Sequence, residues 1–145
     1  MLIKLLVNML ALLLIGISVL ASAPQSALVK AKFEIDGTES KDKFRIVLYA
    51  DGVATEPTVS DEGYFAVPPL NIRKVDVRII SGKYNLLYED VYLAKLRGTL
   101  TFGVNEHLST KDSHCKRGQK LVSSHSLVFE PDDAEGTGMV VEVCK

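Results

Sequence analysis

The amino-acid sequence predicts an all-β domain, a single antiparallel β-sandwich of about eight strands that follows an N-terminal export signal. Apolar residues recur with a period of two over most of the chain, which is the pattern of half-buried strands. Turns that contain Gly, Pro or Asp separate these segments at the short intervals typical of a sandwich. No segment carries a sustained apolar stripe of helical period. A chain of 145 residues has room for one such domain.

The first residues have the layout of a secretory signal peptide. Lys4 gives a short basic start, and residues 5–23 contain no charge and end in small residues. We expect residues 1–21 to be removed by cleavage after Ala21, with Val19 and Ala21 as the small pair, because Pro24 disfavours a cut after Ala23. The alternative is an uncleaved anchor, in which residues 5–23 cross the bilayer and are the only membrane contact. Either arrangement exports the body of the protein to the periplasm or the extracellular space.

The predicted domain spans residues 28–145 and its strands follow from alternation. Val29, Phe33 and Ile35 alternate with charged residues. In the next strand, Phe44, Ile46 and Leu48 alternate with Arg45, Val47 and Tyr49. Asp51-Gly52 is a hairpin-type turn. We expect the strands at 29–35 and 44–49 to lie in one sheet. Further strands are expected at residues 64–67, 75–79, 84–88, 91–93, 100–104, 121–129 and 139–144.

The segment TVSDEGYFAVPPL, residues 58–70, combines a polar turn with a short strand. Asp61 and Gly63 are turn residues, and Pro68-Pro69 cannot donate hydrogen bonds to a sheet, so the strand must end there or lie at an edge. Asp61 and Glu62 are also a candidate acid–base pair. Nothing in the local sequence removes either carboxylate from water, so we interpret the segment as a corner of the sandwich.

The two cysteines, Cys115 and Cys144, are expected to form a structural disulfide. An even number of cysteines in an exported chain favours pairing, and no C-x-x-C motif supports a redox or metal site. The bond would close a loop of about 30 residues and contribute about 3 kcal/mol.

Charge argues against nucleic acid as a partner. The chain has 17 basic and 18 acidic residues, and removal of Lys4 with the signal leaves 16 against 18, a net charge of −2. The basic residues are scattered rather than gathered in a stripe, whereas a nucleic-acid surface requires a basic face.

Part of the chain, about residues 44–104, resembles the carboxypeptidase-regulatory-like and transthyretin-like β-sandwich domains. The matching residues are Val47, Tyr49, Asp51, Gly52, Asp61, Gly63, Phe65, Val67, Leu70, Gly82 and Tyr84. Residues 71–74 and the cysteine-containing tail depart from that pattern. The resemblance implies a sandwich fold and the role of an adhesion, docking or accessory module, and it brings no catalytic residue with it.

Histidines and acidic residues offer weak metal candidates. His107, His114 and His125 lack the compact spacing of a zinc site, so we predict no metal there. Asp132, Asp133 and Glu135 could supply oxygen ligands to calcium, but they lack the ordered spacing of a calcium loop. We interpret that run as a solvated connection whose charges protect a sheet edge.

A serine-rich segment places hydroxyl groups beside an imidazole, at Ser123, Ser124, His125 and Ser126. Neighbouring residues in a strand point to opposite faces, so Ser124 and His125 would not meet, and no G-x-S-x-G motif is present. We expect no enzymatic activity and no cofactor.

Three tyrosines, Tyr84, Tyr88 and Tyr92, recur at four-residue spacing and would share one face of a strand. Tyrosine suits protein and sugar contacts, because it joins an apolar ring to a polar tip. They are the candidate binding face, and the competing interpretation places them at the margin of the core. The leading hypothesis for function is a non-enzymatic module that binds another envelope or secreted protein. The alternative is a sandwich that binds a small ligand or a carbohydrate.

Overall fold

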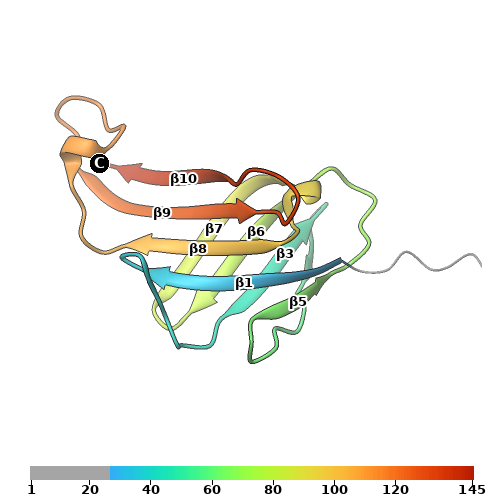
Figure 1. Ribbon diagram of the computed structural model, residues 1–145. Helices are drawn as coiled ribbons and strands as arrows, with labels where there is room; N and C mark the ends of the chain where they lie inside the picture. The colour runs from blue at the N-terminus through green and yellow to red at the C-terminus, as the bar shows by residue number, and fades with distance from the viewer. Residues whose placement is uncertain (1–26) are drawn as a thin grey trace, which may run out of the picture.

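The computed structural model describes residues 27–145, except the side chain of Asp112, and forms two layers of strands (Figure 1). The all-β prediction is confirmed. The expected signal peptide (residues 1–21) and the alternative anchor (residues 5–23) lie outside the described residues. Within those residues, no helix has the length and apolar character needed to span a bilayer.

The first layer is a six-stranded sheet. Its main path is β10 (Thr137–Cys144), β9 (Leu121–Glu130), β8 (Thr99–Asn105), β1 (Ala27–Ile35) and β2 (Thr38–Glu39). β5 (Tyr64–Val67) pairs with the first half of β1, beside the part that pairs with β2. The sheet differs from the purely antiparallel prediction at one place, because β1 and β8 run parallel.

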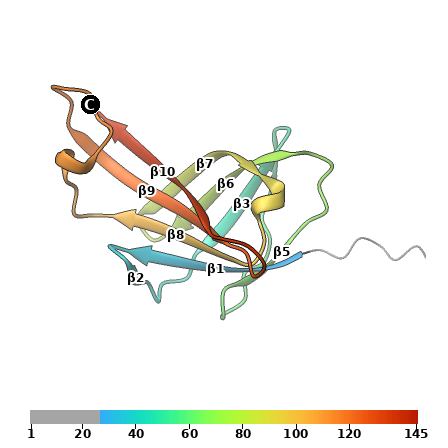
Figure 2. The ribbon, with the colours of Figure 1, turned by 45° about the horizontal axis from the view of Figure 1, so that its top comes forward.

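The second layer is a four-stranded antiparallel sheet in the order β4 (Val53–Thr55), β3 (Arg45–Ala50), β6 (Lys74–Ser81) and β7 (Tyr84–Tyr92). Two single-turn 3-10 helices, η1 (Leu93–Lys95) and η2 (Thr110–Asp112), lie in the connections on either side of β8. Figure 2 shows the two sheets packed face to face, with β3, β6 and β7 behind the first layer.

The expectation that residues 29–35 and 44–49 share a sheet is wrong. Asp36 and Gly37 both have positive φ and turn the chain back into β2, which uses the free edge of β1. The following segment then crosses to the other layer, where β3 pairs with β4 and β6. The Asp51-Gly52 hairpin turn is confirmed, since both residues have positive φ between β3 and β4.

The core lies between the layers and is filled by the alternate residues of each strand. Its largest fully buried side chains include Phe33, Phe65, Phe102 and Tyr88. The Tyr88 hydroxyl on β7 donates to the Ser126 carbonyl on β9 at 2.7 Å, which links the two sheets. Burial raises the pKa of the Tyr88 phenol, so this hydroxyl stays protonated and keeps its donor role.

The C-terminal end of β10 is fixed by the predicted disulfide. Cys115 and Cys144 are bonded, with 5.6 Å between their Cα atoms. Next to this bond, Lys120 and Lys145 exchange backbone hydrogen bonds of 2.7 and 3.0 Å. The long β8–β9 loop and the last strand are therefore joined at two adjacent points.

Candidate interaction surface

The outward side of β8, β9 and β10 forms a continuous sheet face, here called the β8–β10 face. Along β8 the residues alternate strictly between the core and this face, because Leu100, Phe102 and Val104 are buried. The centre of the face consists of nine residues, Thr99, Thr101, Gly103, Asn105, Ser124, Ser126, Val128, Gly138 and Val140. None of these nine residues is charged. Two carboxylates lie at opposite ends of the face, Glu130 opposite Thr99 and Glu142 opposite Ser124.

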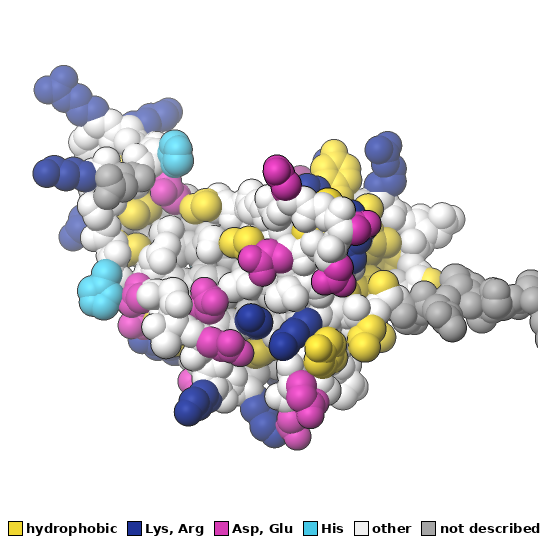
Figure 3. Space-filling model, in the orientation of Figure 1, with side chains coloured by type: hydrophobic (Ala, Val, Ile, Leu, Met, Phe, Trp, Pro, Cys, Tyr) yellow, Lys and Arg dark blue, Asp and Glu magenta, His cyan; other side chains and the backbone are white. Residues whose placement is uncertain are grey.

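The absence of charge from the centre of this face distinguishes it from the neighbouring strand. On the same side of the sheet, β1 carries Lys30, Lys32 and Glu34, the usual composition of a solvated strand. On the β8–β10 face, by contrast, the apolar Val140 is 63% exposed. Figure 3 shows this region as mostly white and yellow atoms, with the blue and magenta side chains of β1 below it.

Small residues make the face flat. At Gly103 an added Cβ would lie 2.8 Å from the Ser126 Oγ, so that these two residues pack closely across β8 and β9. A flat, hydroxyl-bearing surface with an uncharged centre has few water-bound charges to desolvate when another surface covers that centre.

One end of the face is bordered by polar contacts and a shallow hollow. The Asn105 amide donates to the Ser124 hydroxyl at 3.3 Å, and His114 contacts the Glu142 carboxylate through both its backbone N–H and its ring Nδ1, at 2.8 and 3.2 Å. The hollow between these groups and Leu108 has a volume of about 380 Å³.

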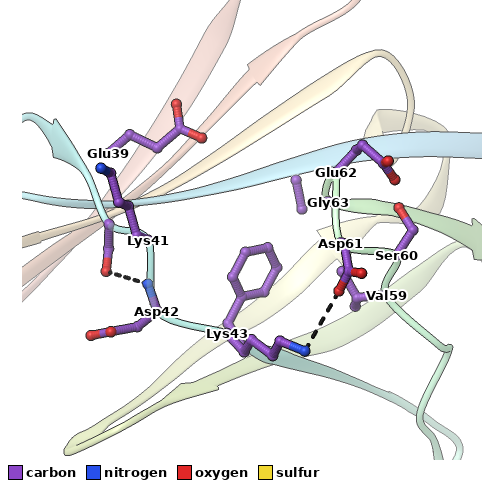
Figure 4. Close-up of a pocket in the computed structure, with 12 residues that line it drawn as sticks. Glu39, Lys41, Asp42, Lys43, Val59, Ser60, Asp61, Glu62 and Gly63 are labelled. Carbon is purple, nitrogen blue, oxygen red and sulfur yellow. Dashed lines mark hydrogen bonds and ion pairs between the residues drawn. The ribbon is translucent and has the colours of Figure 1, made fainter.

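A larger hollow of about 650 Å³ lies between the β2–β3 loop and the β4–β5 turn (Figure 4). Charged side chains border it, including Lys43 and Asp61, which pair at 3.5 Å, while Phe44 and Val59 provide an apolar part. The Lys43 and Asp61 side chains are 94% and 88% exposed, so the ion pair is highly solvated and weak.

The segment 58–70 forms a corner of the sandwich beside this hollow. The Ser60 hydroxyl accepts the Tyr64 N–H at 3.0 Å, and the Gly63 carbonyl accepts the Ala31 N–H at 2.8 Å, which fastens the turn to β1. β5 ends at Val67, immediately before the two prolines, and lies at an edge as predicted. Asp61 and Glu62 are both exposed at the turn.

The three tyrosines do not form one exposed binding face, so that part of the prediction is wrong. Tyr88 is fully buried, and Tyr84 is half-buried against Phe33, with 5.5 Å between ring centroids. Only Tyr92 is strongly exposed, at 48%. The cause is a bulge at Glu89 and Asp90, which shifts the register with β6 and turns Tyr92 to the side opposite Tyr88.

The histidines and serines take separate structural positions. His125 is buried, its ring edge against Tyr88, and its Nε2 contacts the Leu87 carbonyl at 3.2 Å. Ser124 lies on the opposite face, as strand alternation predicts. Among the described residues, no group of three or more His, Cys, Asp or Glu side chains is placed to hold a metal ion.

The acidic connection between β9 and β10 is exposed. Asp133 pairs with Arg97 at 3.2 Å, while the exposed Asp132 and Glu135 belong to the same turn. The weak calcium candidates therefore lie in a solvated loop, in accordance with the interpretation of this run as a solvated connection.

A carboxylate that the sequence did not single out, Asp36, joins two loops. Its oxygens accept the Glu106 N–H at 2.8 Å and contact the His107 Nδ1 at 2.8 Å. Partial burial raises the pKa of Asp36, but the hydrogen bonds from Glu106 and His107 outweigh this effect, and the pKa lies below its ordinary value. Tyr84 and Lys83 contact Glu106 on its other side and lower the pKa of that carboxyl as well.

Comparison with models of protein families, with curated proteins and with solved structures gave no match to this chain. The surface must therefore be interpreted from its own chemistry.

The β8–β10 face was missed by the sequence analysis, although its pattern is readable. Thr99, Thr101, Gly103 and Asn105 alternate with buried apolar residues, and none of the outward positions is charged. That the central outward positions of three adjacent strands are all uncharged is visible only when the register of the strands is known.

Proposed function

We propose that this protein is a non-enzymatic, exported module that binds another envelope or secreted protein. The observation that carries the proposal is the uncharged centre of the β8–β10 face, with Val140 exposed and carboxylates only at its two ends. The cores of protein–protein interfaces are depleted of charged residues, whereas an exposed sheet face normally carries them.

The disulfide supports the part of the proposal that places the protein outside the cytosol. Bonds such as Cys115–Cys144 persist in oxidising environments outside the cytosol. The N-terminal sequence supports export by a signal peptide that ends at Ala21. The resemblance to carboxypeptidase-regulatory-like and transthyretin-like domains, which implies docking rather than catalysis, is part of the same proposal.

The test is to isolate the protein from its own cells under mild conditions and to identify what remains bound to it. We expect a reproducible protein companion that is lost when Thr101, in the centre of the face, is replaced by Glu. Lys32→Glu is the matched control, because it introduces the same residue on the neighbouring strand outside the uncharged region. Recovery without any companion, or equal loss with both variants, would contradict the proposal.

A second candidate function, binding of a small ligand or carbohydrate, is favoured by the hollow of about 650 Å³ beside Phe44 and Val59. Its mixture of apolar floor and charged border is the arrangement of many ligand sites. A ligand that binds the folded state raises the melting temperature. A panel of sugars and calcium that leaves the melting temperature unchanged would exclude these ligands.

A further inference from the structure

We propose that two copies of this chain associate through the exposed edge of β10, with the two β10 strands antiparallel about a two-fold axis at Val140. This inference goes beyond the proposed function, because it concerns the sheet edge and a second copy rather than the sheet face and a different protein.

Among the edge strands of the described residues, β10 alone is both long and unprotected. β2 and β4 have two and three residues, and β5 has four and is followed by two prolines. β7 is long, but a bulge interrupts it, and the Leu87 carbonyl is taken by His125. β10 pairs regularly with β9 from Thr137 to Val143 and contains no proline. Such an edge is open to pairing with another strand.

Register decides which backbone groups of β10 are free. In the parallel pair, Lys30 N–H donates to Gly98 and Asp36 N–H donates to Val104, so these β8 carbonyls face β1. The N–H and C=O groups of successive residues in a strand point to opposite sides. Following this alternation from β8 through its pairs with β9 to β10 leaves one set of β10 residues whose backbone groups point away from β9. These residues are Gly138, Val140 and Glu142.

A two-fold axis at Val140 sets the register of the two paired β10 strands. In this register, Val140 of one copy lies opposite Val140 of the other, Gly138 lies opposite Glu142, and Met139 lies opposite Val141. The 63% exposed Val140 side chains thereby contact each other. No carboxylate meets another, because the only charged residue of the strand, Glu142, lies opposite a glycine. Every outward N–H and C=O at these three positions gains a partner in this register.

Charge at the two ends of β10 supports the same antiparallel arrangement. Beyond its C-terminal end lie four exposed basic residues, Lys116, Arg117, Lys120 and Lys145. Before its N-terminal end, the β9–β10 connection contains Asp132, Asp133 and Glu135, of which Asp133 pairs with Arg97, and Glu130 ends β9 next to it. Figure 3 shows dark blue side chains at the upper left, over the β8–β9 loop, and magenta ones toward the other end of β10.

An antiparallel pair brings the basic end of each copy to the acidic end of the other. Two such contacts form per dimer, one at each end of the paired strands. A single strand pair buries little surface, so the association is weak to moderate and depends on protein concentration. Because exposed charges contribute, it also weakens as the salt concentration rises.

The test uses the full-length sequence expressed in an exporting host, so that the native disulfide forms. Sedimentation equilibrium is expected to show a monomer–dimer equilibrium that shifts to monomer in high salt. Val140→Cys is expected to give a disulfide-linked dimer on mild oxidation, because residues opposite each other lie about 5.5 Å apart at their Cα atoms. Glu142→Cys places its two sulfurs on residues about 13 Å apart and is not expected to cross-link.

Two further variants separate the backbone from the side chain. Val140→Pro removes an outward N–H without removing a bond to β9, so the dimer is expected to dissociate while the fold persists. Val140→Ala keeps that N–H and is expected to retain most of the association. Val53→Cys, on β4 with the same 63% exposure, controls for random cross-linking.

A wild-type protein that stays monomeric at millimolar concentration would overturn the proposal, as would equal cross-linking of the cysteines at 53, 140 and 142. Loss of a native companion on Val140→Pro from a protein that is itself monomeric would assign the edge to a different partner and also overturn it. The proposed function is judged separately, by the effect of Thr101→Glu on the companion.

Discussion

Gly63 holds the turn between β4 and β5 against β1, in a position that leaves no room for a side chain. Its φ is +89°, and an added Cβ would lie 2.4 Å from the Ala31 carbonyl oxygen. We expect Gly63→Ala to lower the free energy of unfolding by about 2–4 kcal/mol, because the strained backbone and the clash with main-chain atoms add together. Urea unfolding monitored by far-UV circular dichroism measures this difference.

Gly37 is the matched control. It has a similar φ of +79°, but an added Cβ would meet nothing within 4 Å. Gly37→Ala should therefore cost only the backbone preference, about 1 kcal/mol. Equal losses for the two variants would show that the contact with Ala31 does not determine the stability of this corner.

Asp36 gives a pH-dependent prediction. Its pKa is lowered below the ordinary value of 3.8 in the folded protein, so folding favours the ionised carboxylate. The stabilisation of the folded protein by the ionised Asp36 is fully present above the ordinary pKa, and it is lost as the pH falls through the lower folded-state pKa. We expect Asp36→Asn to be less stable than the wild type at pH 7, and the difference to shrink as the pH falls below the ordinary pKa of 3.8 and to disappear only below the folded-state pKa.

Asp51→Asn serves as the control for this experiment. Asp51 also has a φ of 49° before a glycine, so the turn chemistry is the same. No hydrogen bond of its side chain is found in the described part of the chain. A difference that persists unchanged at low pH for Asp36→Asn would assign its effect to shape rather than charge.

At the scale of elements, the disulfide makes a separable contribution. Replacing Cys115 and Cys144 together by Ser is expected to lower the free energy of unfolding by about 3 kcal/mol, since the unfolded chain regains the freedom of a loop of about 30 residues. Urea unfolding measures the loss, and amide exchange should rise more in β10 than in β1. Reduction of the wild-type protein should give the same change, and an unchanged midpoint in both cases would contradict this role.

The strands themselves were largely predictable from sequence, whereas their arrangement was not. Alternation identified the segments around Phe33, Phe65 and Phe102, because each has one buried face. Whether β3 would pair with β1 or cross to the other layer depends on contacts far along the chain, chiefly with β6 and β8. Alternation carries no information on those contacts.

The tyrosine prediction failed for a related reason. Four-residue spacing gives one face only when the strand is regular, and the bulge at Glu89 and Asp90 reverses the side of Tyr92. Positive φ at Asp90 has no clear sequence signal, because it is not followed by Gly as Asp36 and Asp51 are. The uncharged centre of the β8–β10 face likewise arises from three strands whose neighbours are set by the fold.

For the whole molecule, the separation of charge along β10 gives a test that no single strand could provide. The basic residues 116 and 117 and the acidic residues 132 and 135 are exposed at opposite ends of the strand. Reversing the basic pair (Lys116→Glu with Arg117→Glu) should weaken self-association, because both end contacts of a two-fold dimer lose their attraction. Reversing the acidic pair (Asp132→Lys with Glu135→Lys) should do the same, and it leaves the Arg97–Asp133 pair intact.

Mixing these two charge-reversed proteins should restore part of the association. In the mixed dimer, one end contact joins the wild-type acidic end of the first protein to the wild-type basic end of the second, and the other joins the two reversed ends, which again carry opposite charges. Each homodimer lacks any such intact contact, so the mixed dimer is expected to be the more stable species at low salt and to lose that advantage at high salt. Sedimentation of the two proteins, alone and mixed at equal total concentration, measures the difference. Antiparallel pairing requires that association recover when the two proteins are mixed. A parallel pairing of β10 strands would place like-charged ends together, so that association would already be weakened in the wild type.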